Sequence, residues 1–257
     1  MFVTHLDTRR KRILQAIVEL YIETASPVSS QAIARRLRSR ISAATVRNVM
    51  AELTEADLVW QPHTSAGRMP TDKGYRYYIN SLLEVEQLTQ QEQESIENQY
   101  PYRREAFDEA LAEILRILSN FSRYTSLAFS SLGKDRLYVT GASYILEQPE
   151  FQDTRKLQPI LRTFERQEPL LEIMKEDLGR DGVSVHIGKE NPCRDIQECS
   201  LVVSNFKIKN RNMGALGIIG PRRMSYPKVI STVGYIARVL SVRIADYDER
   251  GELWMQR

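Results

Sequence analysis

The first eighty residues carry apolar positions at the spacing of amphipathic helices. From Thr8 to about Thr24 an apolar residue recurs every three or four positions, and Pro27 ends the run. A short second helix is predicted over residues 31–37 and a third over residues 43–57. Three helices with a tight turn between the second and the third are typical of a helix-turn-helix.

Residues with capping side chains precede these helices. Ser29 or Ser30 can cap the second helix, Ser42 the third, and Thr71 or Asp72 a further helix that follows. Within the third helix, one apolar stripe is expected to face inward: Val46, Val49, Met50 and Leu53.

A segment of different composition separates the third helix from the last one. The run "LVWQP" has strand character, whereas "HTSAGRMP" is too polar and too rich in small residues to be buried. Gly67 permits a chain reversal that a larger residue would resist. Helices followed by a β-ribbon loop predict a winged helix-turn-helix domain over residues 1–83.

Residues 84–102 are rich in Glu and Gln and are predicted to form a partly helical linker. Thr89 and Glu92 have the spacing of a capping box, in which the two residues bond reciprocally through side chains and backbone amides. An amphipathic helix follows from about Arg103 to Phe121. Its apolar face consists of Phe107, Leu111, Ile114, Leu115 and Leu118.

The rest of the chain mixes short β-rich runs with helical patterns. The β-rich runs span residues 124–131, 136–141, 182–188, 199–208 and 213–220. Helices are expected over residues 153–165, where Pro159 should kink or break the helix, and over 168–178; Pro227 opens a last helix. Antiparallel strands flanked by helices predict an α+β domain over residues 103–257.

Composition limits the class of protein. The 257 residues, 42% of them hydrophobic, suffice for two modest domains with ordinary cores. The sequence has no apolar run near the roughly 18 residues of a membrane span, and no signal-peptide pattern, so we expect a cytoplasmic protein without a membrane partner. Cys193 and Cys199 are expected to be reduced structural thiols.

Charge is distributed unevenly along the chain. Residues 1–80 contain 12 Lys and Arg against 7 Asp and Glu, whereas the remaining residues carry 24 against 26. A basic first third suggests an anionic partner for that part of the chain alone. A merely solvated basic surface is the alternative.

The start of the third helix carries the side chains that serve in reading DNA. A major groove admits an α-helix whose N-terminal residues reach base edges, through hydroxyls, small apolar groups, arginine and amides. The candidate base-reading residues are Ser42, Ala43, Thr45, Arg47 and Asn48. The alternative is a solvated helix face, because helix-turn-helix patterns alone are weak signals.

The polar loop favours DNA binding over that alternative. A wing that contacts phosphates or the minor groove needs an exposed backbone of small residues together with an arginine. The candidates on the wing and its rim are His63, Thr64, Ser65, Gly67, Arg68, Lys73 and Arg76. The tyrosines of "YRYYI" could stack on single-stranded bases, but half-buried packing is the interpretation we adopt for them.

Catalysis has little support in the sequence. The three histidines lie far apart, and none has metal-ligand spacing with the cysteines. No phosphate-binding glycine motif is present, and a structural role for Cys193 is more common than a catalytic one. We therefore expect no enzyme, no cofactor and no metal.

Five segments together resemble the heat-inducible transcription repressor (HrcA) family: "SPVSSQAIARRL", "SAATVRNVMAEL", "QPHTSAGRMPTDKGYRYYI", "LEQPEFQD" and "MGALGIIGPRRMSYPKVI". The resemblance covers residues about 6–83 closely and about 136–245 clearly. It implies a winged helix that binds double-stranded operator DNA, an inverted repeat called CIRCE upstream of chaperone operons. It also implies a homodimer, a GAF-like second domain, and a DNA-binding form that the GroE chaperonin promotes and heat depletes.

On the same resemblance, Ser42 to Asn48 would read operator bases, and Arg68 with its neighbours would contact the DNA backbone or minor groove. One departure from the family pattern is expected to matter. Members usually carry further strands and an inserted dimerisation domain where this chain has only "LGK". We therefore expect a reduced GAF-like domain, with dimerisation through the helix at 103–121 or through the shortened domain itself.

Two other functions stay open at this point. A ligand-sensing regulator would bind a small molecule in the second domain and change its DNA affinity in response. An interaction protein would use the winged helix to dock a partner protein, and its binding would depend only weakly on salt.

Overall fold

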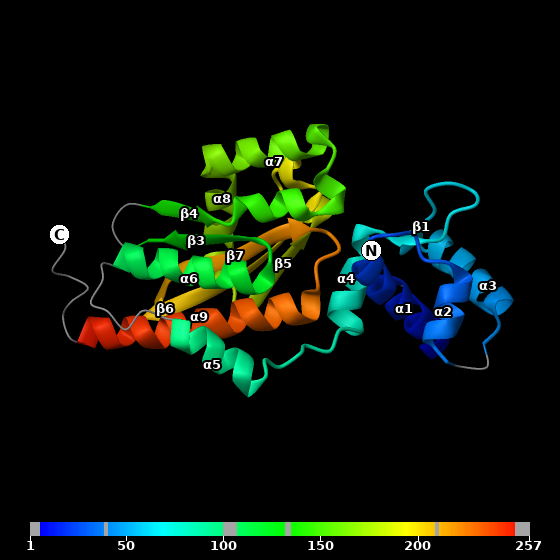
Figure 1. Ribbon diagram of the computed structural model, residues 1–257, viewed down its shortest axis with the longest axis horizontal. Coiled ribbons are helices and arrows are strands. Elements are labelled where there is room, and N and C mark those ends of the chain that lie inside the picture. The colour runs from blue at the N-terminus through cyan, green and yellow to red at the C-terminus, as the bar shows by residue number, and fades with distance from the viewer. Residues whose placement is uncertain (1–5, 39–40, 100–106, 132–134, 209–210, 250–257) are drawn as a thin grey trace. The chain divides into compact units, whose positions relative to one another are not determined.

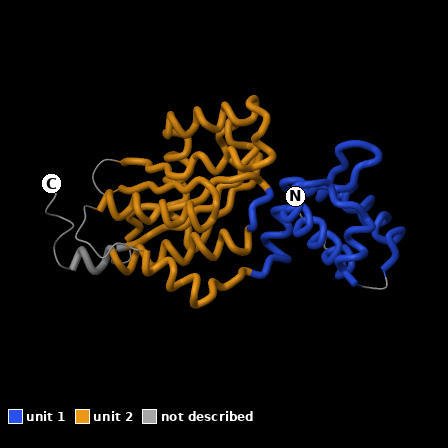
Figure 2. Tube along the Cα trace, viewed as in Figure 1, with its two compact units in different colours: residues 1–84, 223–225 blue, residues 85–222, 226–257 orange. Residues whose placement is uncertain are grey.

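The chain divides into two units. The computed structural model describes residues 6–38, 41–99, 107–131, 135–208 and 211–249 (Figure 1). One unit comprises residues 1–84 with 223–225, and the other comprises residues 85–222 with 226–257 (Figure 2).

The first unit follows the helix-turn-helix pattern predicted from the sequence. In chain order it contains α1 (Thr8–Thr24), α2 (Ser30–Arg36), α3 (Ala43–Glu55), β1 (Val59–Trp60), β2 (Met69–Pro70) and α4 (Asp72–Ser81). Of the candidate caps, Ser29 accepts a hydrogen bond from the Ala32 amide and Thr71 accepts one from the Gly74 amide. The prediction of capped helices is confirmed. Each capping hydrogen bond stabilises its helix by about 1 kcal/mol relative to a helix without a capping side chain.

The core of this unit comes from the predicted apolar stripes. Val46, Val49, Met50 and Leu53 are all buried on α3 and pack with the inner faces of α1 and α2. The tyrosines of α4 complete this core, since Tyr75, Tyr77 and Tyr78 are at most 8% exposed. Packing is therefore confirmed as the role of these rings, and they present no stacking surface to single-stranded bases.

The second unit contains long helices, a sheet and several short 3-10 turns. Its helices are α5 (Gln90–Gln99), α6 (Phe107–Ser122), α7 (Thr154–Arg166), α8 (Glu168–Glu176) and α9 (Tyr226–Glu249). Its strands are β3 (Thr125–Ser130), β4 (Arg136–Thr140), β5 (Val183–Ile187), β6 (Cys199–Ile208) and β7 (Arg211–Pro221). The 3-10 turns are η1 (Ala142–Glu147), η2 (Pro149–Phe151), η3 (Asp177–Gly179), η4 (Gly188–Glu190) and η5 (Arg194–Ile196).

The strands form one antiparallel sheet in the order β4-β3-β7-β6-β5. All six residues of β3 are buried, which requires that both faces of the sheet be covered. Helices α7 and α8 lie on one face, and α6 and α9 lie on the other (Figure 1). The predicted α+β class of this part of the chain is confirmed.

The short connection after β3 still completes the sheet. Strand β4 pairs with β3 from Ser126↔Thr140 to Ser130↔Arg136, so the two strands form a hairpin across the shortened segment. The predicted start of the preceding helix, at Arg103, lies outside the described residues, and α6 is described from Phe107.

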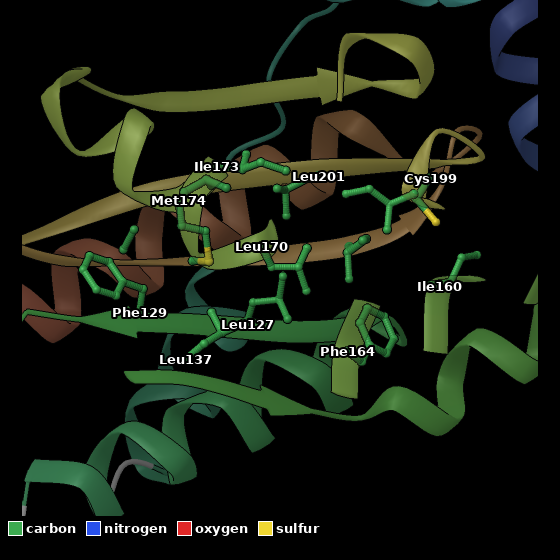
Figure 3. Packing of buried hydrophobic residues seen from close by; sticks show 14 of the residues in the cluster. Leu127, Phe129, Leu137, Ile160, Phe164, Leu170, Ile173, Met174, Cys199 and Leu201 are labelled. Carbon is green, nitrogen blue, oxygen red and sulfur yellow. The ribbon is translucent and has the colours of Figure 1, made fainter. Parts of the chain in front are cut away.

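An apolar cluster fills the space between the sheet and the pair α7 and α8 (Figure 3). Leu127 and Phe129 of β3 and Leu201 of β6 meet Leu170 and Met174 of α8 in this cluster. The thiol of Cys199 is buried there too, where burial raises its pKa. This face of the sheet is therefore a packed core.

Of the kink or break expected at Pro159, the break is wrong, because α7 continues through this residue from Thr154 to Arg166, and the kink stays a prediction. A proline removes the hydrogen bond to the carbonyl four residues earlier, which here belongs to Arg155 in the first turn of α7. Arg155 is exposed, so water can hydrate its carbonyl and the helix tolerates the proline.

Candidate nucleic-acid interface

One side of α3 is buried and the opposite side presents a continuous outward face. Ala44, Arg47, Asn48 and Ala51 are exposed at the spacing of neighbours on a helix, and we call them the α3 face. Within the described parts of the chain, the side chains of Arg47 and Asn48 form no hydrogen bond or ion pair. Their donors and acceptors are therefore available to a ligand.

The first turn of α3 has a structural role that the sequence also predicted. The Ser42 hydroxyl accepts a hydrogen bond from the Thr45 amide at 3.1 Å and lies 3.0 Å from the Thr45 hydroxyl. Ala43 and Thr45 are half-buried, whereas Ser42 is exposed. Contact of these three residues with DNA stays a prediction, alongside the capping that the structure shows.

The wing tip is ordered by a residue that sequence reasoning missed. The Gln61 amide donates to the Thr64 carbonyl at 2.9 Å and to the Ala66 carbonyl at 2.8 Å. His63, Thr64 and Ser65 are exposed at the tip of this loop. The side-chain amide of Gln61 thus replaces missing backbone partners and leaves the predicted contact residues facing solvent.

Gly67 is required for a different reason from the one predicted. Arg68 pairs with Val28 through two backbone hydrogen bonds of 2.9 Å, which adds the segment before α2 to the ribbon of β1 and β2. A Cβ atom at position 67 would lie 2.3 Å from the Val28 carbonyl oxygen. The glycine therefore permits a close backbone approach, and the prediction that it serves a chain reversal is corrected.

The cations near the wing have partners inside the protein. The Arg68 Nε atom donates to the Thr54 hydroxyl at 3.0 Å, and Lys73 donates to the Ala56 carbonyl at the C-terminal end of α3 at 2.8 Å. We call Gly67, Arg68 and Lys73 the wing base. Arg76 lies one turn from Asn80 on α4, with 3.4 Å between Nη1 and Oδ1. Contact of these residues with DNA stays a prediction. The structure adds that Arg68 holds the wing against α3 and that Lys73 holds the start of α4 against the end of α3.

Acidic groups near the α3 face are partly neutralised. The Glu52 carboxylate accepts a hydrogen bond from the Arg10 side chain at 2.6 Å, and this bond raises the pKa of the Arg10 guanidinium. Glu52 follows Ala51 at the edge of the α3 face. The pairing lowers the repulsion that Glu52 would otherwise exert on an approaching phosphate.

Sequence reasoning missed Ala51 and included Ala44 only within the range Ser42 to Asn48, although the helical repeat places both beside Arg47 and Asn48. Small apolar side chains at these positions let a helix approach a groove closely and can contact a thymine methyl. Thr54, by contrast, carries no local signal, because its role depends on Arg68 from a later segment.

Among the described residues, none of the helices is long and apolar enough to cross a membrane. Within the same parts of the chain, His, Cys, Asp and Glu side chains nowhere gather in a group of three or more that could hold a metal ion.

Helices packed around a β-ribbon, with an outward face on the third helix, define a winged helix-turn-helix DNA-binding unit, here joined to a GAF-like α+β domain. The chain belongs to the HrcA family. Residues 5–84 match the family model described as "Winged helix-turn-helix transcription repressor, HrcA DNA-binding", and residues 72–230 match the one described as "HrcA protein C terminal domain".

Relatives named heat-inducible transcription repressor HrcA align along nearly their whole length. The protein from Geobacter sulfurreducens is 30% identical over 93% of this chain and 98% of its own. The one from Symbiobacterium thermophilum is 29% identical over 92% and 98%, respectively. A crystal structure described as that of a hypothetical protein has the same fold, with a TM-score of 0.81 and 19% identity over 94% of this chain and 99% of its own.

The alignments with relatives are longer than the chain itself. They extend over 336 and 334 positions, against 257 residues here. The relatives therefore contain at least 77 positions without a counterpart in this chain. This difference agrees with a shortened second domain, in which the hairpin of β3 and β4 forms one edge of the sheet.

Proposed function

We propose that this protein is a heat-inducible transcription repressor that binds operator DNA through the α3 face. The observation that carries the proposal is the pair Arg47 and Asn48, exposed on α3 and without partners among the described residues. The names of the relatives support the regulatory role, and the matching winged-helix model supports DNA as the ligand.

In this proposal α3 enters the major groove. The Arg47 guanidinium has the fork of donors that pairs with the O6 and N7 acceptors of guanine, and the Asn48 amide can pair with the N6 and N7 edge of adenine. The exposed hydroxyls of Thr64 and Ser65 and the ring of His63 would donate to phosphates from the wing tip. Phosphate contacts position the unit, and the contacts of α3 select the sequence.

A homodimer fits this mode of binding. Two copies related by a two-fold axis present two α3 helices to the two halves of an inverted repeat, such as a CIRCE-like operator. Residues 1–83 would bind DNA, residues 84–102 would connect the domains, and residues 103–257 would dimerise and regulate. Linking two modules raises the effective concentration at the second half-site, so a monomer should bind much more weakly.

Release on heating would begin in the second domain. Domains of this size are marginally stable, so a modest rise in temperature can loosen the dimer before the helix-turn-helix unit unfolds. The GroE chaperonin is the proposed partner that restores the DNA-binding form. Operator binding that survives reversible melting of residues 103–257 would contradict this route of release.

The DNA-binding proposal is tested with the full chain and fluorescently labelled duplexes. One duplex carries the inverted repeat from a chaperone-operon promoter, and the other carries the same bases in shuffled order. We expect at least a thousandfold preference for the repeat, with an affinity that falls steeply as salt rises. Equal affinity for both duplexes, or an affinity insensitive to salt, would contradict the proposal.

A further inference from the structure

The second unit contains a groove that the DNA-binding function does not use. It has a volume of about 850 Å³ and lies between α9, the β5–β6 edge of the sheet and the segment that precedes α5. This volume is in the range of pockets that hold small molecules. The groove is on the α9 side of the sheet, whereas the α7–α8 side is filled by the apolar cluster of Figure 3.

Apolar side chains line the groove and stay exposed. Val85 is 54% exposed and Val242 is 62% exposed, although both are large hydrophobic residues. Half-buried Val183 and Ile230 and the buried Leu88 complete the apolar part of the same lining. Exposed apolar groups gathered in a concave site are typical of ligand binding, because an occupant removes them from water.

The charge of the lining is predominantly positive. Arg180, Lys207 and Arg238 line the groove, against Glu86 as the acidic residue of the lining. Arg180 is neutralised by the buried carboxylate of Asp177 at 2.9 Å, so Lys207 and Arg238 are the cations that an anion can reach. Arg238 stacks over the ring of Tyr235 at 5.8 Å, and no carboxylate among the described residues pairs with it. Lys207 pairs with Asp181, but that side chain is 91% exposed, so water screens the pair strongly.

The segment that forms one wall, together with α5 directly after it, is held to α9 by three polar contacts. Ser231 donates to the Glu86 carbonyl, Lys228 pairs with Glu92 at 2.9 Å, and Tyr235 donates to Glu97 at 2.5 Å. Burial, together with this carboxylate, raises the pKa of Tyr235 to about 12, so its hydroxyl stays protonated as a donor. A ligand that contacts Val85 and Leu88 would therefore bind to a segment whose position is already fixed by these contacts with α9.

We propose that this groove binds an amphipathic anion: an apolar chain or ring system that carries a carboxylate. The apolar lining would receive the body of the ligand, and Arg238 with Lys207 would receive the carboxylate. A small molecule fits better than a protein partner, because stable protein interfaces bury well over 1,000 Å² in total and this site is a single concave groove. The site stands independently of the DNA-binding proposal, although its wall directly follows the DNA-binding unit in the sequence.

Dodecanoate is the probe, and binding to the full chain is followed by titration calorimetry in the absence of DNA, below the micelle concentration. We expect saturable binding at one site. Arg238→Gln and Val242→Asp should each weaken it at least tenfold, because one removes the cation and the other places a carboxylate in the apolar lining. Both residues are exposed, so the variants are expected to fold, which circular dichroism checks.

Two matched variants serve as controls. Arg162→Gln removes an exposed arginine from α7, and Leu146→Asp alters a leucine that is 57% exposed outside the groove. Both should bind dodecanoate like the wild type, and amide exchange of residues 85–88 should slow on binding. The proposal is overturned by an absence of saturable binding, by equal losses in the control variants, or by dodecyltrimethylammonium binding as tightly as dodecanoate.

Discussion

The α3 face and the wing base carry similar polar side chains, but they differ in where those side chains find their partners. Arg47 and Asn48 project from α3 without a partner in the described protein. Arg68 and Lys73 bond instead to Thr54 and to the Ala56 carbonyl, both near the C-terminal end of α3. Residue type alone would assign all four to DNA.

This difference separates residues that read DNA bases from residues that position the DNA-binding unit. An arginine with five free donors can form a bidentate contact to a base. An arginine whose Nε donates to a threonine hydroxyl instead fixes the orientation of the element that carries it. We therefore expect changes on the α3 face to alter sequence preference with little effect on stability. Changes in the wing base should alter stability and affect all duplexes alike.

The largest effect is expected for Arg47→Ala. Loss of a bidentate base contact should reduce the preference for the inverted repeat over shuffled duplex by about 1–3 kcal/mol, or roughly fivefold to 150-fold. The melting temperature should not change, because the side chain has no partner among the described residues to lose. Arg12→Ala, which removes an exposed arginine from α1, is the matched control and should keep the preference. A similar loss in both variants would mean that only net charge matters.

Gly67→Ala should cost about 2 kcal/mol of unfolding free energy, because the new Cβ meets the Val28 carbonyl and backbone cannot rotate away as a side chain can. Denaturant unfolding and the amide exchange of Val28 and Arg68 measure the effect. Gly179→Ala is the control, since a Cβ there meets nothing within 4 Å. Equal stability of the two variants would show that the close approach at Gly67 is not maintained.

Gln61→Ala should lower the free energy needed to open the wing tip by about 1 kcal/mol, because two carbonyl oxygens lose their donor. Binding should weaken by a similar factor for the inverted repeat and for shuffled duplex, as expected of a residue that orders phosphate contacts. If instead the variant lost discrimination between the two duplexes, the wing would have to read bases.

The smallest effect concerns Asp7, the N-cap of α1. The hydrogen bond from the Arg10 amide, and then the Arg10 charge, lower the pKa of the Asp7 carboxyl below its usual 3.8. A depressed pKa stabilises the fold above pH 3.8 and loses this contribution as pH falls through the lowered value. Protection of α1 amides in Asp7→Asn should therefore fall below the wild type at neutral pH, and the difference should shrink in acid. A difference that grows in acid would contradict this sign.

Much of the first unit could be predicted because its signals are local. Helical repeats and capping residues such as Ser42 lie within a few positions of the structure they specify. The capping box of Thr89 and Glu92 is likewise present at the start of α5. The packing of the tyrosines followed from composition, since aromatic rings stabilise cores more often than they form platforms.

The parts that could not be predicted depend on contacts between distant segments. The role of Gly67 is set by the backbone at Val28, and that of Arg68 by a hydroxyl on α3. The groove joins residues from the start of α5 with residues of β6 and α9. The break expected at Pro159 was wrong because the sequence pattern did not show where the helix begins. The carbonyl that lacks a hydrogen bond to Pro159 lies in the exposed first turn of α7.

Base substitution across the operator is the most direct test of reading by the α3 face. Affinities of the full-length wild type and of Arg47→Ala are measured for a panel of inverted repeats, each changed at one base pair in both half-sites. We predict that Arg47→Ala becomes indifferent to one base-pair position in each half-site, while Arg68→Ala keeps the wild-type profile at lower stability. Parallel profiles for Arg47→Ala and the wild type would contradict the account.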